Sequence, residues 1–207
     1  MGHNQRIRTN LFTVRRLVVD QLEVNQLLVD GDTPVLQGER GELGEDITRR
    51  KFIGGTVVDE LVLSDLAVDI TDTGGAGGGY GAYSLITLPS ARIVLLGIYL
   101  DLSLVAGEDI GATATIAVAL GSAAEDTNST LDGTSGDYVA SAGSTLVGSE
   151  GDIQSAGPAA PALVDASDGD EEIFLNFGVP QAGISDNSTI TVSGKIRLVY
   201  IDLSQEA

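Results

Sequence analysis

The sequence predicts an all-β protein in which an N-terminal arm and short-strand repeats precede a β-sandwich of jelly-roll type. Hydrophobic residues make up 43% of the 207 residues, aromatic residues only 4%, and there are 27 glycines. A core of Val, Leu, Ile and Ala suits thin, tightly packed β layers better than a deep ligand pocket. Strand-like segments alternate with connections rich in Ser, Gly, Ala and Asp, which is typical of all-β folds.

Charge separates a basic arm from an acidic body. Residues 1–16 contain four arginines and no acid, and residues 1–51 balance eight bases against eight acids, so the formal net charge of −19 lies in residues 52–207. An acidic body argues against a sequence-independent grip on nucleic acid, and we expect no direct nucleic-acid partner.

The arm favours docking on an acidic protein surface, because arginine makes forked contacts with carboxylates. The alternatives are contact with nucleic acid and a tail that only aids solubility. The residues predicted to anchor are Arg6, Arg8, Arg15, Arg16, Arg49, Arg50 and Lys51.

Residues 17–71 contain two arrays of the pattern L-x-V-[DN]-x with a period of five, at 17–31 and 56–70. Leu and Val two positions apart share one face of a strand, and the Asp or Asn that follows favours a turn. An amphipathic helix is the competing interpretation, but the β-branched content favours short strands.

A single array cannot bury both of its faces, so several copies around a common axis, and hence a homo-oligomer, are expected. The predicted oligomer-interface residues are Leu17, Val19, Leu22, Val24, Leu27, Val29, Leu61, Leu63, Leu66 and Val68.

Two glycine-rich stretches interrupt this pattern. Residues 38–46 hold three Gly-x-y units, for which a charged loop is favoured over a three-chain polyproline coil. Residues 72–82 predict a hinge and the boundary to a sandwich domain at 83–207. They are not expected to bind phosphate, because the Lys and the Ser or Thr that end a phosphate-binding loop do not follow the glycines.

The sandwich strands are expected at residues 84–88, 92–105, 111–120, 173–177 and 189–202. The last of these is apolar almost continuously, which predicts burial on both faces, in a sandwich core or at a subunit contact. Residues 121–171 are expected to form mainly long connections.

Residue types limit the possible chemistry. The chain has no cysteine and one histidine, His3, which excludes thiol chemistry, disulfides, a histidine triad and a zinc site. Paired carboxylates for glycoside hydrolysis remain open, but few aromatic platforms are available. We expect no enzymatic activity and no cofactor. Asp165, Asp168 and Asp170 form the best candidate cation site, with a solvated acidic loop as the favoured interpretation.

No run of about 18 apolar residues predicts a membrane span, and no apolar run of a secretory signal follows the N-terminus. The sequence therefore predicts a protein that is made and used in soluble form, without a membrane partner.

The basic arm, the L-x-V-[DN] arrays, the Gly-x-y segment and the ending at 184–203 together resemble the capsid decoration (cement) proteins and head fibres of tailed bacteriophages. The resemblance implies a homotrimer that is made in the host cytoplasm and lies on the virion surface. Its arm would bind the major capsid protein, and its β body would project from the head. One alternative is a tail-fibre or receptor-binding protein whose loops at 121–171 bind a host glycan or protein. A bacterial surface adhesin is the other, and the missing signal peptide disfavours it.

Overall fold

A computed structural model describes residues 28–29, 33–34, 37–44, 46–53, 56–88, 92–158, 160–165 and 171–203. The described residues are almost entirely β structure, with two short 3-10 helices, η1 (Gly133–Ser135) and η2 (Gln181–Gly183). The strands are β1 (Leu28–Val29), β2 (Thr33–Pro34), β3 (Gln37–Gly44), β4 (Ile47–Ile53), β5 (Val57–Asp72), β6 (Gly79–Thr87), β7 (Arg92–Ala106), β8 (Thr115–Gly121), β9 (Val139–Thr145), β10 (Glu150–Gly157), β11 (Ala162–Asp165), β12 (Glu172–Val179) and β13 (Ser188–Asp202). The predicted all-β fold is confirmed.

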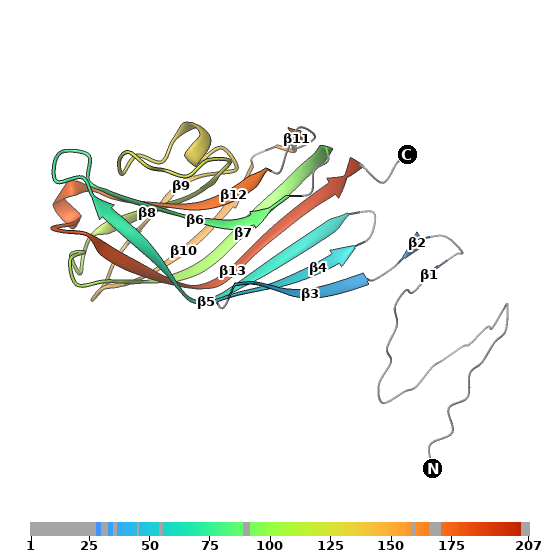
Figure 1. The fold of residues 1–207 in the computed structure, drawn as a ribbon, viewed down its shortest axis with the longest axis horizontal. Coiled ribbons are helices and arrows are strands. Elements are labelled where there is room, and N and C mark those ends of the chain that lie inside the picture. Colours follow the sequence, from blue (N-terminus) through green and yellow to red (C-terminus); the bar gives the residue numbers. More distant parts are fainter. Residues whose placement is uncertain are drawn as a thin grey trace, which may run out of the picture.

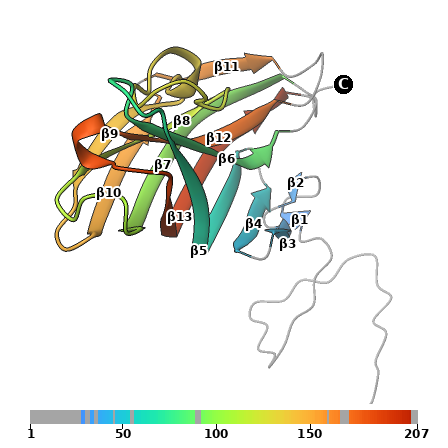
Figure 2. The same cartoon turned by 60° about the vertical axis from the view of Figure 1, so that its left-hand side comes forward.

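One antiparallel sheet curls over itself to make two layers. Its strand order is β10-β7-β13-β5-β6-β12-β8-β9, with β11 added beside β7 and the pair β3–β4 added beside β5. Strands β10, β11, β7, β13, β5, β4 and β3 form what we call the first layer, and β6, β12, β8 and β9 lie over it as the second layer (Figures 1 and 2). Strands β1 and β2 form a separate two-stranded sheet.

The core lies between the two layers and is aliphatic, as the composition predicts. Alternate residues of β7 (Ile98, Leu100, Leu102 and Leu104) are at most 3% exposed and face the second layer's buried side chains, such as Phe177 of β12. Burying such side chains removes apolar surface from water, which is the main favourable term in folding. The packed interior leaves the functional surfaces to the outer faces and the loops.

A β-bulge explains how a period of five fits one long strand. Five is odd, so successive L-x-V units of a regular strand would face opposite sides of the sheet. In β5 the register with β13 shifts at Ser64–Asp65, and Asp65 has the left-handed φ of 55°. Leu61 and Leu63 before the bulge, and Leu66 after it, therefore all point into the core.

The predicted division into a repeat region and a sandwich is wrong for residues 56–71. Strand β5 pairs with β13 from Val57 to Ile70, so the second array is a central strand of the body rather than a separate region. The expected hinge at 72–82 is the ordered turn between β5 and β6, in which the Thr73 N–H donates to the Gly78 carbonyl at 3.1 Å. Gly78 has a φ of +71°, and a Cβ there would lie 2.3 Å from the Val179 carbonyl oxygen, so glycine is required.

The other strand predictions have mixed outcomes. The strands expected at 84–88, 92–105, 173–177 and 189–202 correspond to β6, β7, β12 and β13, whereas only the second half of the segment 111–120 is a strand. The Gly-x-y segment is strand β3, paired with β4, and neither a loop nor a polyproline coil. Residues 121–171 contain β9, β10 and β11, which were not predicted.

Candidate anchoring and assembly surface

The first layer contains a buried ion pair at the end where the N-terminal strands join. The Arg49 Nε and Nη2 of β4 donate to the two Asp59 carboxylate oxygens of β5 at 2.8 and 2.9 Å. The Tyr200 hydroxyl of β13 donates to Asp59 Oδ2 at 2.8 Å. Asp59 is fully buried, while the Arg49 side chain is 24% exposed. These contacts fix β4, and through it β3, to the body.

The environment of Tyr200 keeps its hydroxyl protonated. Burial raises the pKa of Tyr200 above its usual range, and the negative charge and hydrogen bond of Asp59 raise it further, while the Arg49 charge partly opposes them. Tyr200 is thus a hydrogen-bond donor to Asp59 at neutral pH.

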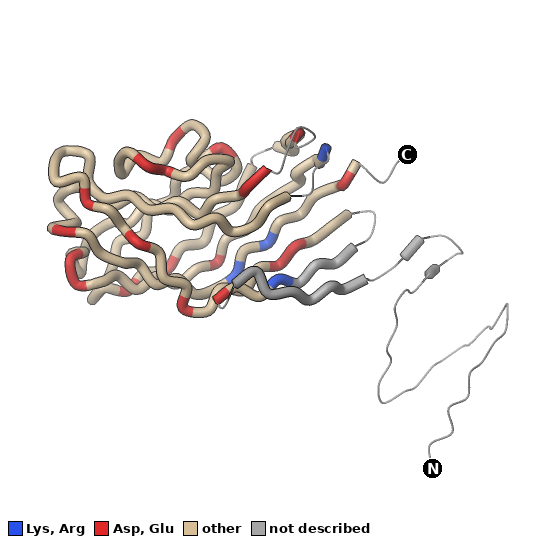
Figure 3. The backbone as a smooth tube through the Cα atoms, viewed as in Figure 1, with Lys and Arg blue, Asp and Glu red and all other residues tan. Residues whose placement is uncertain are grey.

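Cationic side chains are confined to the first layer. Every Lys and Arg among the described residues lies on β3, β4, β7 or β13, and the strands of the second layer have none. Figure 3 shows no blue on the strands of the second layer. On the outer face, Arg197 donates to Glu60 at 2.8 Å, and Arg92 donates to Asp165 at 3.0 Å. Both guanidinium side chains remain more than half exposed, at 54% and 63%. The strands of the first layer also carry more acids than bases, so this layer holds charges of both signs, whereas the strands of the second layer hold one acid, Glu172.

The outer face of the first layer also carries exposed apolar side chains, which we call the apolar band. Leu163, Tyr99 and Leu96 are 64%, 56% and 37% exposed. Strand register brings them next to partly exposed aliphatic side chains, since Val94 lies opposite both Leu163 and Ile201. The Tyr99 ring lies over Gly97, where a Cβ would be 3.4 Å from it, and Gly97 is opposite Val199. The band comprises Val94, Leu96, Tyr99, Leu163, Val199 and Ile201.

The structure places the predicted site residues in different surroundings. Leu61, Leu63, Leu66 and Val68, predicted at an oligomer interface, are at most 2% exposed in the single chain, so that assignment is wrong. They fill the chain's own core because β5 is a central strand.

The remaining interface and anchoring candidates fall mostly on undescribed positions. Residues 1–27, which include the four arm arginines, lie outside the described residues, as do the side chains of Val29, Arg50 and Lys51. Arg49 is described, and its two hydrogen bonds to Asp59 give it a structural role that the sequence did not indicate.

The candidate cation site is only partly described. Asp165 forms the ion pair with Arg92, and Asp168 and Asp170 lie outside the described residues. Within the described ranges, no group of three or more His, Cys, Asp or Glu side chains could hold a metal ion.

The loop between β8 and β9 is fixed to the outer face of the second layer by Asn176. This fully buried amide donates to the carbonyl oxygens of Ala123 and Ser135, at 3.0 and 2.8 Å, and accepts from the Glu125 N–H at 2.9 Å. A Cβ at Gly178 would lie 2.2 Å from the Ser129 carbonyl oxygen, so glycine lets the loop approach. The first third of the segment predicted to be long connections is therefore ordered.

Two ionisable groups in and beside this loop, Glu125 and Tyr138, have pKa values shifted by their surroundings. Burial acts to raise the pKa of Glu125, but hydrogen bonds from the Thr127 hydroxyl and from the Asn128 and Thr127 N–H groups outweigh it, and the pKa lies below its usual value. Burial, together with a hydrogen bond to Glu171, raises the pKa of Tyr138 above its usual range. These groups support the loop structurally.

Replacing Asn176 with Ala is expected to lower the free energy of unfolding by about 3 kcal/mol, because buried backbone groups of the loop lose their partners. Urea unfolding followed by circular dichroism measures the loss, and limited proteolysis should show earlier cleavage in residues 122–137. Asn128→Ala is the matched control, since its side-chain contacts are local, and should cost less than about 1 kcal/mol. Equal losses for the two variants would contradict this role of Asn176.

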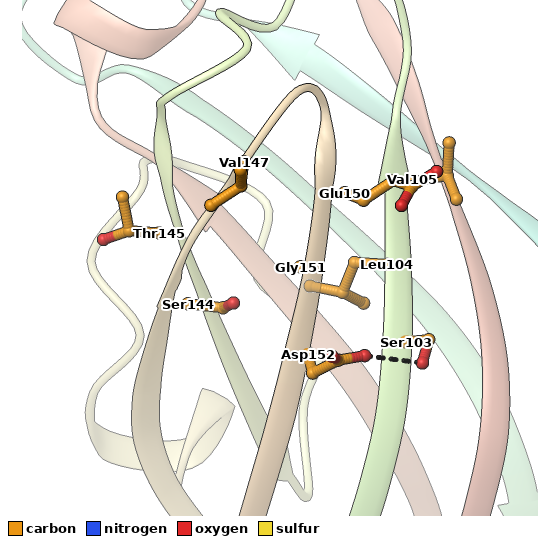
Figure 4. Close-up of a pocket in the computed structure, with 9 residues that line it drawn as sticks. All are labelled: Ser103, Leu104, Val105, Ser144, Thr145, Val147, Glu150, Gly151 and Asp152. Carbon is orange, nitrogen blue, oxygen red and sulfur yellow. Dashed lines mark hydrogen bonds between the residues drawn. The ribbon is translucent and has the colours of Figure 1, made fainter.

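A shallow groove of about 530 Å³ lies beside the turn between β9 and β10 (Figure 4). It is lined by Ser103, Leu104, Val105, Ser144, Thr145, Val147, Glu150, Gly151 and Asp152. The Ser103 hydroxyl donates to Asp152 Oδ1 at 2.6 Å, but the lining has no histidine or lysine that could serve as a base for a nucleophile. It also has no aromatic side chain on which a sugar ring could stack.

Comparisons with known proteins give no family. No family model matches the chain. A search of curated proteins found no match. The described part of the chain contains no helix with the length and hydropathy needed to cross a membrane.

Two solved structures show a distant likeness. One is described as "CBM4 structure and function": the identity is 12%, the TM-score is 0.37, and the match covers 69% of this chain and 82% of the other. The second is an acid-stable capsid structure of Helicobacter pylori bacteriophage KHP30, with 18% identity, a TM-score of 0.25, and coverage of 70% and 92%. At scores this low, the likeness carries no argument for a shared function.

Proposed function

We propose that the chain is a non-enzymatic structural protein of a tailed-bacteriophage particle, a trimeric decoration protein that binds and stabilises the phage head through its N-terminal region. The observation that carries the proposal is the distribution of charge. Every described Lys and Arg lies on the first layer, which continues through β4 and β3 towards the arginine-rich residues 1–16.

The ion pair of Arg49 and Asp59 supports a mechanical role. It ties β4 to the central strand β5, and the Tyr200 hydroxyl adds a contact from β13. A force applied through the N-terminal segment would thus pass into the middle of the first layer rather than to a loop. Several arms that engage neighbouring shell subunits at once would turn weak single contacts into high avidity.

The body supports a projecting, inert module. Its described interior is filled by aliphatic side chains, and its groove has no activated nucleophile. The net negative charge of residues 52–207 would keep particles apart by mutual repulsion and so preserve their solubility.

The second candidate function is that of a tail-fibre or receptor-binding protein. The groove beside the β9–β10 turn favours it, because that groove presents the polar groups of Ser103, Thr145 and Asp152 beside apolar side chains. Its lack of aromatic platforms disfavours a glycan and leaves a protein surface as the partner for this candidate.

Quantitative mass spectrometry of purified particles tests the proposal. A decoration protein should be present at a copy number comparable to that of the shell protein, and it should be released when the particle surface is stripped at high salt. A few copies per particle, in tail fractions, would support the second candidate instead. Absence from particles would contradict both.

A further inference from the structure

The apolar band is larger than the isolated apolar side chains that are normal on a protein surface. It combines three side chains that are 37–64% exposed with three partly exposed aliphatic neighbours, across β11, β7 and β13. Contiguous apolar patches of this kind mark interaction sites. The near-continuous apolar pattern of residues 189–202 predicted burial on both faces, and in the single chain only one face of β13 is buried.

Charge indicates what covers the band. The guanidinium groups of Arg92 and Arg197 flank it, and each already forms an ion pair, with Asp165 and Glu60 respectively. These two residues and Lys195 are the only bases in residues 52–207. The band itself is apolar, so a short segment rich in Leu and Val fits it better than the strongly acidic bodies of other copies would.

The first pentad array has this chemistry. Residues 17–31 contain six Leu and Val residues at the L-x-V positions, three acids and no base. The acids are Asp20, Glu23 and Asp30. In β5 a bulge at Ser64–Asp65, between the second and third units, keeps Leu61, Leu63, Leu66 and Val68 on one face. An equivalent bulge would turn the residues of the first array towards one apolar surface.

The described N-terminal strands lead away from the chain's own body. Among the described strands, Leu28–Val29 pairs with Thr33–Pro34 and not with the large sheet, and β1 and β2 lie beyond the end of β3 (Figures 1 and 2). About 20 residues precede β3 from the start of the array, and at roughly 3.3 Å per residue they reach about 65 Å. That is enough to reach the body of an adjacent molecule.

We propose that the apolar band is the docking site for residues 17–31 of a neighbouring copy of this chain. Each copy would give its acidic L-x-V array to the next and receive one on its own band, which is a heterologous contact that closes into a ring. The inference rests on the oligomeric assembly in the proposed function, but not on the identity of the particle.

Cysteine cross-linking tests the contact, because the chain has no cysteine of its own. Full-length Val24→Cys and Leu163→Cys chains, distinguished by tags of different mass, are co-expressed and mildly oxidised. The expected result is a disulfide-linked heterodimer that disappears on reduction. The matched control pairs Val24→Cys with Val147→Cys, an 80% exposed residue about 35 Å along the layer from Leu163, and should give little product.

Two outcomes would overturn the proposal. Equal cross-linking at Leu163 and Val147 would mean that the band is not a docking site. A link within a single Val24→Cys/Leu163→Cys chain, with no product between differently tagged chains, would mean that each array covers its own band.

Light scattering on a size-exclusion column gives an independent measurement. The unmodified protein should have a mass about three times 21.3 kDa. Tyr99→Asp/Leu163→Asp should elute as a monomer with an unchanged melting temperature, and Val147→Asp should retain the full mass. The proposal would be overturned if the unmodified protein were a monomer, or if the double variant kept the full mass. If the double variant kept the full mass but no longer bound particles, the band would be the docking site for a shell protein instead.

Discussion

Arg49→Ala is expected to lower the free energy of unfolding by about 3–5 kcal/mol, because it leaves a buried carboxylate without its counter-charge. Asp59 is fully buried, and two of the three hydrogen bonds that the described residues give it come from Arg49. The remaining donor, the Tyr200 hydroxyl, cannot neutralise the charge. Urea unfolding followed by circular dichroism measures the loss.

An exposed ion pair in the same layer is the matched control. Arg92 Nε donates to Asp165 at 3.0 Å, and the two side chains are 63% and 44% exposed. Water replaces the lost contact in Arg92→Ala, so the expected cost is at most about 1 kcal/mol. If the two alanine variants lost equal stability, burial of Asp59 would not be the reason.

A triple substitution separates the charge from the packing. Arg49→Met/Asp59→Leu/Tyr200→Phe removes all three polar groups and keeps side chains of similar size, so most of the lost stability should return. A triple variant as unstable as Arg49→Ala would show instead that the ion pair itself, and not an uncompensated charge, determines the effect.

The strands that could be predicted from the sequence are those in which apolar and polar residues alternate along the chain. In β7, Leu100, Leu102 and Leu104 alternate with polar residues, and the structure buries all three. Strands β9 and β10 were missed because their residues, VASAGST and EGDIQSAG, are small or polar and have low strand propensity. They are strands because they pair with β8 and β7, which is information about tertiary structure.

The buried ion pair could not be predicted for a related reason. Arg49 was predicted to anchor the chain to a partner because it lies in a basic run, and nothing local distinguishes it from Arg50. Its partner Asp59 is ten residues away in a strand whose register was unknown, and Tyr200 is 141 residues from Asp59. The β5 bulge likewise depends on Ser193 of β13, whose hydroxyl accepts from the Asp65 N–H.

The apolar band shows the complementary case, in which the sequence was more informative than the single chain. The near-continuous apolar residues at 189–202 predicted a strand buried on both faces, either in a sandwich core or at a subunit contact. The exposed side chains of Leu163 and Tyr99 on the neighbouring strands favour the subunit contact. A strand that is apolar on a face its own chain leaves uncovered indicates a partner.

Reversing the charge of two arm residues, Arg15→Glu/Arg16→Glu, is expected to abolish incorporation into particles while the body remains folded. Residues 1–16 carry four arginines and no acid, so the reversal replaces two of the four positive charges with negative ones. These negative charges would repel an acidic partner. In a trimer the loss is repeated in every arm, and avidity multiplies it. Co-sedimentation with particles measures incorporation, and an unchanged melting temperature shows that the body is intact.

Arg15→Lys/Arg16→Lys separates charge from geometry. Lysine keeps the positive charge but loses the planar fork that binds a carboxylate through two hydrogen bonds, so binding should weaken without disappearing. Binding that remains should also fall as salt increases, since exposed charges are screened. Normal incorporation of the glutamate variant would refute the anchoring role. If Val24→Cys and Leu163→Cys still cross-link between chains that carry the glutamate substitutions, the copies assemble with one another whether or not the arm binds the particle.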